Sequence, residues 1–173
     1  RQGAVPGVVG TLMSNLALER ALGKLGIAFA RAGVGDRYVL ELLQQKGWQL
    51  GGENSGHIIC LDKHTTGDGI VSALQVLSVL RTGGATLATL SKGLELYPQE
   101  LVNVRVPRGF DWRKKPAITK ASREAERVLG RNGRVLLRPS GTEPLLRVMV
   151  EGKDRDQVGR LAGMIADAVR NSV

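Results

Sequence analysis

The chain has 173 residues, of which 42% are hydrophobic, 24% charged and 3% aromatic. These hydrophobic and charged fractions are ordinary for a globular protein and exclude a disordered chain, and the length suits one domain or two small ones. No apolar run reaches the ~20 residues of a membrane span, so we expect no membrane contact. Cys60 is the single cysteine and has no partner for an intramolecular disulfide, which favours the cytoplasm. The first residue is Arg1 rather than Met, which indicates a piece of a longer polypeptide.

Positive charge is concentrated in the last part of the chain, although the net charge of the whole is +9. Residues 1–103 contain 9 Lys and Arg against 8 Asp and Glu, whereas residues 104–173 contain 16 against 8. A field of this sign attracts anions of any kind, whether nucleic acid, acidic lipid or small phosphorylated molecules. The change predicts a domain over 1–103, a linker or hinge rich in Pro, Gly and charge over 104–116, and a second domain over 117–173.

Strands and helices are predicted to alternate in the first domain. A buried strand over 5–13 precedes a helix capped by Asn15, and a second strand over 27–32 precedes a helix that Asp36 caps and Gly47 ends. Short strands over 48–50 and 58–61 follow, and Asp68 caps an apolar helix that runs to about Leu80. This order predicts a mixed, mainly parallel α/β/α sandwich.

The second half has a different order of elements. A strand over 101–106 leaves the first domain, and Pro116 opens a helix that Gly130 ends. Strands over 134–138 and 145–151 follow, and Asp154 caps a final helix with one apolar face. The order predicts a small α+β domain, in which an antiparallel sheet is covered by two helices.

The segment from Arg138 to Pro144, with Arg147 just after it, has the composition of an anion-binding loop. Arg138 supplies a guanidinium fork, Ser140 and Thr142 supply hydroxyls, and Gly141 leaves room for backbone amides to approach an oxyanion. The alternative is an ordinary hairpin turn, in which the same residues only satisfy the turn. Because the loop lies in the basic part of the chain, we favour phosphate binding.

A second polar loop, residues 52–57, lies between two predicted strands. Glu53 accepts hydrogen bonds from vicinal hydroxyls, Ser55 donates or accepts them, and His57 lies beside a carboxylate in sequence, so the loop suits a sugar. A hairpin loop without a ligand would look the same. His57, His64 and Asp62 do not form a compact set of ligands, so we expect no metal site here.

Three motifs in chain order carry a resemblance to a known family: G-E-N-S-G-H at 52–57, T-T-G-D-G at 65–69 and R-P-S-G-T-E-P at 138–144. Together they resemble the α-D-phosphohexomutase superfamily, and most closely its bacterial branch that acts on glucosamine phosphates. The resemblance covers essentially the whole chain. It corresponds to the C-terminal half of those four-domain enzymes, the third domain and a fourth domain of the TATA-binding-protein-like kind.

The resemblance implies interconversion of glucosamine 6-phosphate and glucosamine 1-phosphate through a phosphoserine enzyme and a bisphosphorylated sugar, with Mg²⁺. It assigns sugar hydroxyls to Glu53, Ser55 and His57, with a possible assisting role of His57 in catalysis. It assigns the phosphate that is not transferred to Arg138, Ser140, Gly141, Thr142 and Arg147. No segment resembles the family's serine loop or its metal loop, so we expect no catalytic residue, no bound Mg²⁺ and no activity here without the N-terminal domains.

Three alternatives stay open at this point. A phosphomannomutase/phosphoglucomutase of the same superfamily would share both loops. A basic nucleic-acid-binding module would suit the net charge, but aromatic residues for base stacking are scarce and no helix-turn-helix or zinc-finger spacing occurs, so we expect no nucleic acid as partner. A domain that only docks on a partner is the third.

Overall fold

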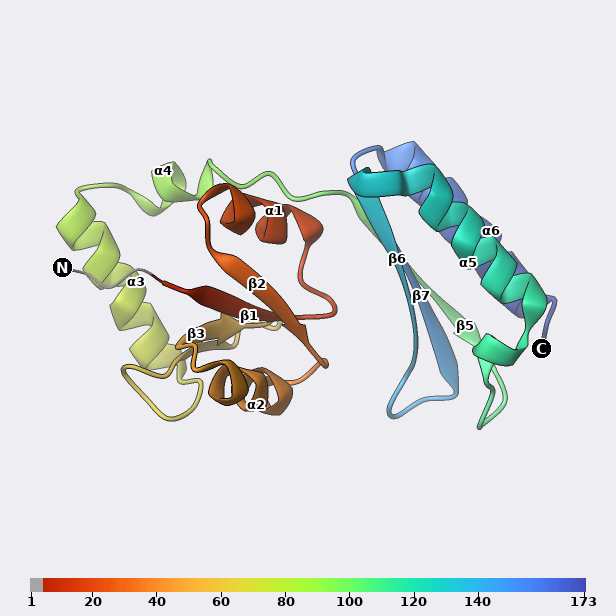
Figure 1. The fold of residues 1–173 in the computed structure, drawn as a ribbon, viewed down its shortest axis with the longest axis horizontal. Coiled ribbons are helices and arrows are strands. Elements are labelled where there is room, and N and C mark those ends of the chain that lie inside the picture. The colour runs from red at the N-terminus through yellow and green to blue at the C-terminus, as the bar shows by residue number, and fades with distance from the viewer. Residues whose placement is uncertain (1–4) are drawn as a thin grey trace. The chain divides into compact units, whose positions relative to one another are not determined.

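The computed structural model describes residues 5–173, and the chain divides into two compact units between Leu96 and Tyr97 (Figure 1). The first unit is built on a four-stranded sheet and the second on a separate three-stranded sheet. This confirms the predicted fold class, a mixed α/β unit followed by an α+β unit.

The sheet of the first unit has the strand order β2-β1-β3-β4. The strands β1 (Gly7–Thr11), β2 (Ala28–Ala32) and β3 (Leu50–Gly52) are parallel, and β4 (Ile58–Cys60) returns antiparallel to β3. Helices α1 (Leu16–Lys24) and α2 (Asp36–Lys46) lie on opposite faces of this sheet (Figure 1). A small core joins α2 to the sheet through Val9, Ala32, Val39, Leu43 and Ile59.

Two further helices complete the first unit, α3 (Gly69–Gly83) and α4 (Leu87–Ser91). The predicted caps of α1 and α3 are confirmed: the Asn15 side chain accepts from Ala17 N, and Asp68 accepts from the amides of Ile70 and Val71. The cap predicted for α2 is wrong, because Gly35 holds that position and Asp36 is the first residue of the helix. No residue of α3 or α4 is buried. No helix within residues 5–173 combines the length and the apolar character needed to cross a membrane.

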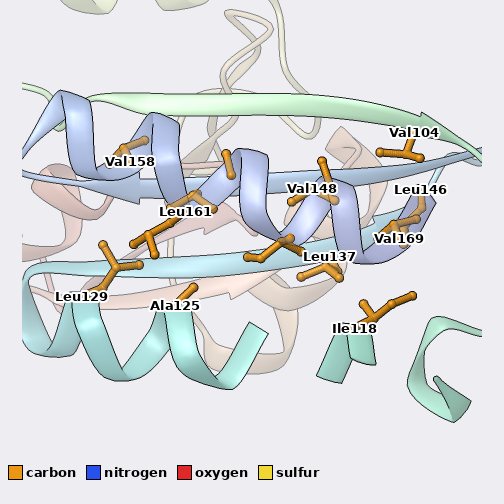
Figure 2. Close-up of a cluster of buried hydrophobic side chains, with 14 residues drawn as sticks. Val104, Ile118, Ala125, Leu129, Leu137, Leu146, Val148, Val158, Leu161 and Val169 are labelled. Atoms are coloured by element: carbon orange, nitrogen blue, oxygen red, sulfur yellow. The ribbon is translucent and has the colours of Figure 1, made fainter. Parts of the chain in front are cut away.

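The second unit follows the predicted order of elements. Strand β5 (Gln99–Arg105) precedes α5 (Pro116–Leu129), β6 (Gly133–Pro139), β7 (Leu145–Gly152) and α6 (Arg155–Arg170), and short 3₁₀ turns lie at η1 (Trp112–Lys114) and η2 (Gly130–Asn132). The sheet is antiparallel with the order β5-β7-β6. Both helices pack on one of its faces, and the core between them includes Leu137, Val148, Leu161 and Ile118 (Figure 2).

The division between the units lies earlier in the chain than the sequence predicted. Strand β5 pairs with β7 from Gln99 to Arg105, so it belongs to the second sheet rather than to the first domain. The segment over 106–112, expected to be part of a linker, packs against the second core through Val106, Phe110 and Trp112. Proline, glycine and charge are signals of local chain flexibility, and they carry no information on a strand partner some 45 residues away in the sequence.

Candidate functional site

The polar loop of the first unit lies at the carboxyl edge of the parallel strands, where ligands of open α/β sheets usually bind. Two hydrogen bonds tie this loop, residues 52–57, to the segments that follow the neighbouring strands. The Gly35 amide, at the start of α2, donates to Glu53 Oε2 at 3.2 Å, and Asn54 Nδ2 donates to the Met13 carbonyl at 3.2 Å. The loop is therefore held in place by β1 and β2 as well as by its own hairpin.

The internal structure of this loop exposes its tip. The Glu53 amide donates to the His57 carbonyl at 3.0 Å and the Gly56 amide to the Glu53 carbonyl at 3.1 Å. Gly56 has φ +92°, a conformation that favours glycine. Ser55 is exposed at the tip, and the Glu53 carboxylate, which receives one bond from Gly35, keeps further acceptor positions for a ligand.

His57 joins this loop to two other segments. Its Nε2 lies 3.3 Å from the Gly67 carbonyl oxygen and 3.9 Å from Asp36 Oδ2. A Cβ on Gly67 would overlap the imidazole ring, so glycine is needed at that position. The T-T-G-D-G motif thus has two structural tasks, since Gly67 admits His57 and Asp68 caps α3.

The second unit brings two guanidinium groups together on β6 and β7. Arg138 and Arg147 are directly paired across the strands, on the sheet face opposite the one formed by core residues Leu137, Leu146 and Val148. The Nε atoms of both arginines are buried without a hydrogen-bond partner, and Arg138 forms no ion pair within residues 5–173. Burial, and secondarily the charge of Arg147, lower the pKa of Arg138. Two like charges opposite each other destabilise a sheet, so an anion is the group that would suit this pair.

The turn between these strands contacts the same pair through Arg147. Arg147 Nη2 donates to Ser140 Oγ at 3.3 Å and lies 3.7 Å from Glu143 Oε2. Gly141 and Thr142 are exposed at the end of the turn. Gly141 has no positive φ, and a Cβ there would meet no atom within 4 Å, so neither the backbone nor a neighbour requires glycine at this position. A close approach by a ligand is the remaining physical reason for it.

A groove of about 470 Å³ lies beside the turn. Its walls are Val106–Arg113 and Pro139–Glu143 with Leu145, and the Val106 amide ties the two segments by donating to the Pro144 carbonyl at 3.0 Å. Ser140, Gly141 and Thr142 therefore line the groove, whereas Arg138 and Arg147 are outside its lining. Of the predicted phosphate-binding residues, the structure brings Arg138, Arg147 and Ser140 into one cluster.

The residues over 106–113 are the part of this site that the sequence did not indicate. Arg108 and Arg113 line the groove, and the buried Trp112 Nε1 has no hydrogen-bond partner within residues 5–173. The available signal was the pair Phe110 and Trp112, because two aromatic residues are unusual in a solvated linker. Asp36, placed near His57, is the corresponding addition in the first unit.

Within residues 5–173, no three His, Cys, Asp or Glu side chains come together in a way that could hold a metal ion.

Two domain families match the chain almost from end to end. Residues 1–97 match "Phosphoglucomutase/phosphomannomutase, alpha/beta/alpha domain III", and residues 101–168 match the C-terminal domain of the same proteins. The chain belongs to the phosphoglucomutase/phosphomannomutase family. Both candidate loops lie inside the matched ranges, one in domain III and one in the C-terminal domain.

Curated relatives within this family are similar over nearly all of the chain. It is 67% identical over 171 residues to the phosphoglucosamine mutase of Aromatoleum aromaticum and 66% identical over 166 residues to that of Nitrosospira multiformis. These alignments cover 99% and 96% of the chain but only 38% and 36% of the relatives. The chain thus spans less than two fifths of the length of the relatives it matches.

Solved structures of the family share the fold at low identity. The N-acetylphosphoglucosamine mutase of Aspergillus fumigatus is 22% identical with a TM-score of 0.80, and the match covers 96% of this chain and 38% of that one. A phosphoglucomutase/phosphomannomutase family protein from Burkholderia thailandensis is 20% identical with a TM-score of 0.72, with the same coverage. The Aspergillus enzyme has also been solved in complex with GlcNAc-6P and magnesium.

Proposed function

We propose that this chain is the substrate-recognition part of a phosphoglucosamine mutase, the enzyme that interconverts glucosamine 6-phosphate and glucosamine 1-phosphate. The identity of 67% and 66% to relatives with that name supports this substrate over the glucose and mannose phosphates of the wider family. We also propose a cytoplasmic location, on the grounds that Cys60, the one cysteine, is free.

The observation that carries the proposal is the pair Arg138 and Arg147 beneath the turn, in which Arg138 has no acidic partner within residues 5–173 and Arg147 faces the exposed Glu143 at 3.7 Å. A phosphate dianion bound there would receive charge-assisted hydrogen bonds from both guanidinium groups and from Ser140, with further donors at Gly141 and Thr142. The chain keeps an unfavourable arrangement in its free form, and the ligand relieves it on binding. In this proposal the two arginines hold the phosphate that is not transferred.

The loop of the first unit would bind the sugar ring. Glu53 accepts hydrogen bonds from vicinal hydroxyls, and Ser55 at the tip donates or accepts one. His57 contacts the ring or assists a proton transfer, with Gly67 behind it. Hydroxyl groups on both sides of a hexose form similar hydrogen bonds, so this loop would suit a ring that has to bind in two opposite orientations.

The chemistry itself would take place on groups outside this chain. A phosphoserine transfers its phosphoryl group to the free hydroxyl of the substrate, which gives a bisphosphorylated sugar, and the other phosphate returns to the serine after the sugar has turned. In this proposal Mg²⁺ would also be held by segments outside this chain. The chain alone should then bind sugar phosphates without converting them.

A titration of the isotope-labelled chain with glucosamine 6-phosphate, followed by amide NMR, tests the proposal. Shifts at Ser140 to Thr142 and at Glu53 to His57 are expected, with a weak dependence on salt because only one phosphate is bound. Binding of nucleic acid would instead fall steeply with salt, since many phosphates are neutralised. Unmoved amides at Ser140 to Thr142 would refute the phosphate site.

A panel of sugar phosphates separates the two enzyme functions. Glucosamine 6-phosphate should bind in preference to glucose 6-phosphate and mannose 6-phosphate at equal concentration. A preference for mannose 6-phosphate would favour the phosphomannomutase alternative and leave the phosphate site intact.

A further inference from the structure

Helix α3 is unusually apolar on its exposed side. From Gly69 to Leu80 it contains no charged residue, and its polar side chains there are Ser72, Gln75 and Ser78. A surface helix normally turns its apolar stripe toward the core and its charged and polar residues toward water. An exposed apolar side of α3 therefore predicts that something covers it.

The structure leaves this helix uncovered. Ile70, Leu74 and Leu77, spaced on one side of the helix, are 74%, 56% and 58% exposed, and Val76 and Val79 are also exposed. No residue of α3 is buried within residues 5–173. Single exposed apolar residues are ordinary, but a contiguous row of this kind marks an interaction surface.

The exposed row lies on the side of α3 that points away from the sheet. Ser72 Oγ donates to the Ile58 carbonyl at 3.2 Å, so the Ser72 side of α3 faces β4. With 3.6 residues per turn, Ile70, Leu74 and Leu77 lie about 140–160° around the helix from Ser72. We call Ile70, Leu74 and Leu77 the α3 surface.

We infer that the α3 surface is covered in the intact protein by the part of the polypeptide that the relatives carry beyond domain III and the C-terminal domain. More than three fifths of the length of each relative lies outside the match, which is ample to cover one face of a helix. The three residues of the surface are all aliphatic, as in the core of a permanent interface. The inference rests on family membership and on this extra length, not on the mutase chemistry.

Two other occupants fit the surface less well. Helices that lie on a membrane surface carry a basic face, and α3 has only Arg81, in its last turn. A second copy of the chain is not needed to cover the helix, because each relative has its own segments beyond the two matched domains. Both occupants are distinguished by the experiment below.

Thiol labelling measures whether the surface is covered. A chimera is built in which this chain replaces the aligned part of the Aromatoleum aromaticum relative, and Leu77→Cys is introduced into the chimera and into the isolated chain, both with Cys60→Ser. Leu77→Cys should react at least tenfold more slowly in the chimera. Leu25→Cys, at a position 73% exposed beyond the end of α1, is the control and should react at the same rate in both.

Equal labelling of Leu77→Cys in the two proteins would overturn the inference. Protection in the isolated chain that grows with its own concentration would assign the surface to a second copy, and protection only with anionic vesicles would assign it to a membrane; both also overturn it. Hydrogen exchange over the aligned helix of the unmodified relative gives the same answer if the chimera fails to fold. None of these readouts requires activity, so the result stands whether or not the proposed substrate is correct.

Discussion

Replacing Arg138 with methionine should change stability and binding in opposite directions. Methionine has a similar length and no charge, so Arg138→Met removes the like-charge contact with Arg147 and the buried Nε that has no partner. Like charges opposite each other in a sheet cost ~0.2–1 kcal/mol, so we expect the free energy of unfolding of the second unit to rise by about that amount. A structural arginine would show a loss instead.

The same substitution should weaken phosphate binding strongly. A hydrogen bond to a charged group contributes ~1.5–3 kcal/mol, which corresponds to a loss of ~10- to 150-fold in affinity for glucosamine 6-phosphate. Calorimetry gives the affinity. Denaturant unfolding followed by Trp112 fluorescence gives the stability of the second unit, in a Trp48→Phe background because the chain has two tryptophans.

Arg134→Met is the matched control, on the same strand and the same face of the sheet. Arg134 Nη2 lies 2.9 Å from Glu151 Oε2, and Glu151 is fully buried. Its removal leaves a buried carboxylate without its cation and should cost ~3–5 kcal/mol, with little change in phosphate affinity among the molecules that remain folded. If Arg138→Met destabilised the unit as Arg134→Met does and left binding unchanged, the anion site would be refuted.

Three further predictions address single residues. Gly141→Ala should leave the free energy of unfolding unchanged or raise it by up to ~1 kcal/mol, because the backbone there suits any residue. The same substitution should weaken phosphate binding in the NMR titration. A loss of stability with intact binding would show that the glycine is structural. Hydrogen bonds from the Val71 amide, and to a lesser extent from the Ile70 amide, hold the pKa of Asp68 below its ordinary 3.8. The stability that this cap contributes is therefore complete above pH 3.8 and is lost as the pH falls below it. Circular dichroism should show an acid-dependent loss of helix that Asp68→Asn largely removes, and an identical acid profile in the variant would contradict this. Burial raises the pKa of the Cys60 thiol above 9.0, so Ellman's reagent at pH 8 should react more slowly than with free glutathione, whereas an equal rate would show an accessible thiolate.

The fold was predictable because its elements are specified locally. Asn15 and Asp68 are helix caps recognisable from the sequence, and their side chains form the expected bonds. The position of β5 was not predictable in this way. Its place in the second sheet depends on pairing with β7, and the alternation of its residues suits either sheet.

The candidate site was predictable in its residues and less so in its geometry. The turn and the two arginines follow from composition, but only the strand register shows that Arg138 and Arg147 are cross-strand neighbours. Likewise, proximity of His57 to Gly67 and Asp36 is a consequence of parallel strands ending at one edge. The proline and the charged residues at 106–113 predicted a linker, whereas the structure shows a packed segment that lines the groove.

The arginine pair and the α3 surface are two places where this chain leaves an unfavourable arrangement uncorrected, and their chemistry distinguishes what each one lacks. Arg138 and Arg147 are only half-buried, so water solvates part of their charge in the free form and a small anion can bind and leave. Exposed aliphatic rows such as Ile70, Leu74 and Leu77 promote association for as long as they remain uncovered. A small anion therefore suits the first as a reversible ligand, and only a partner that stays bound, such as another part of the same polypeptide, suits the second.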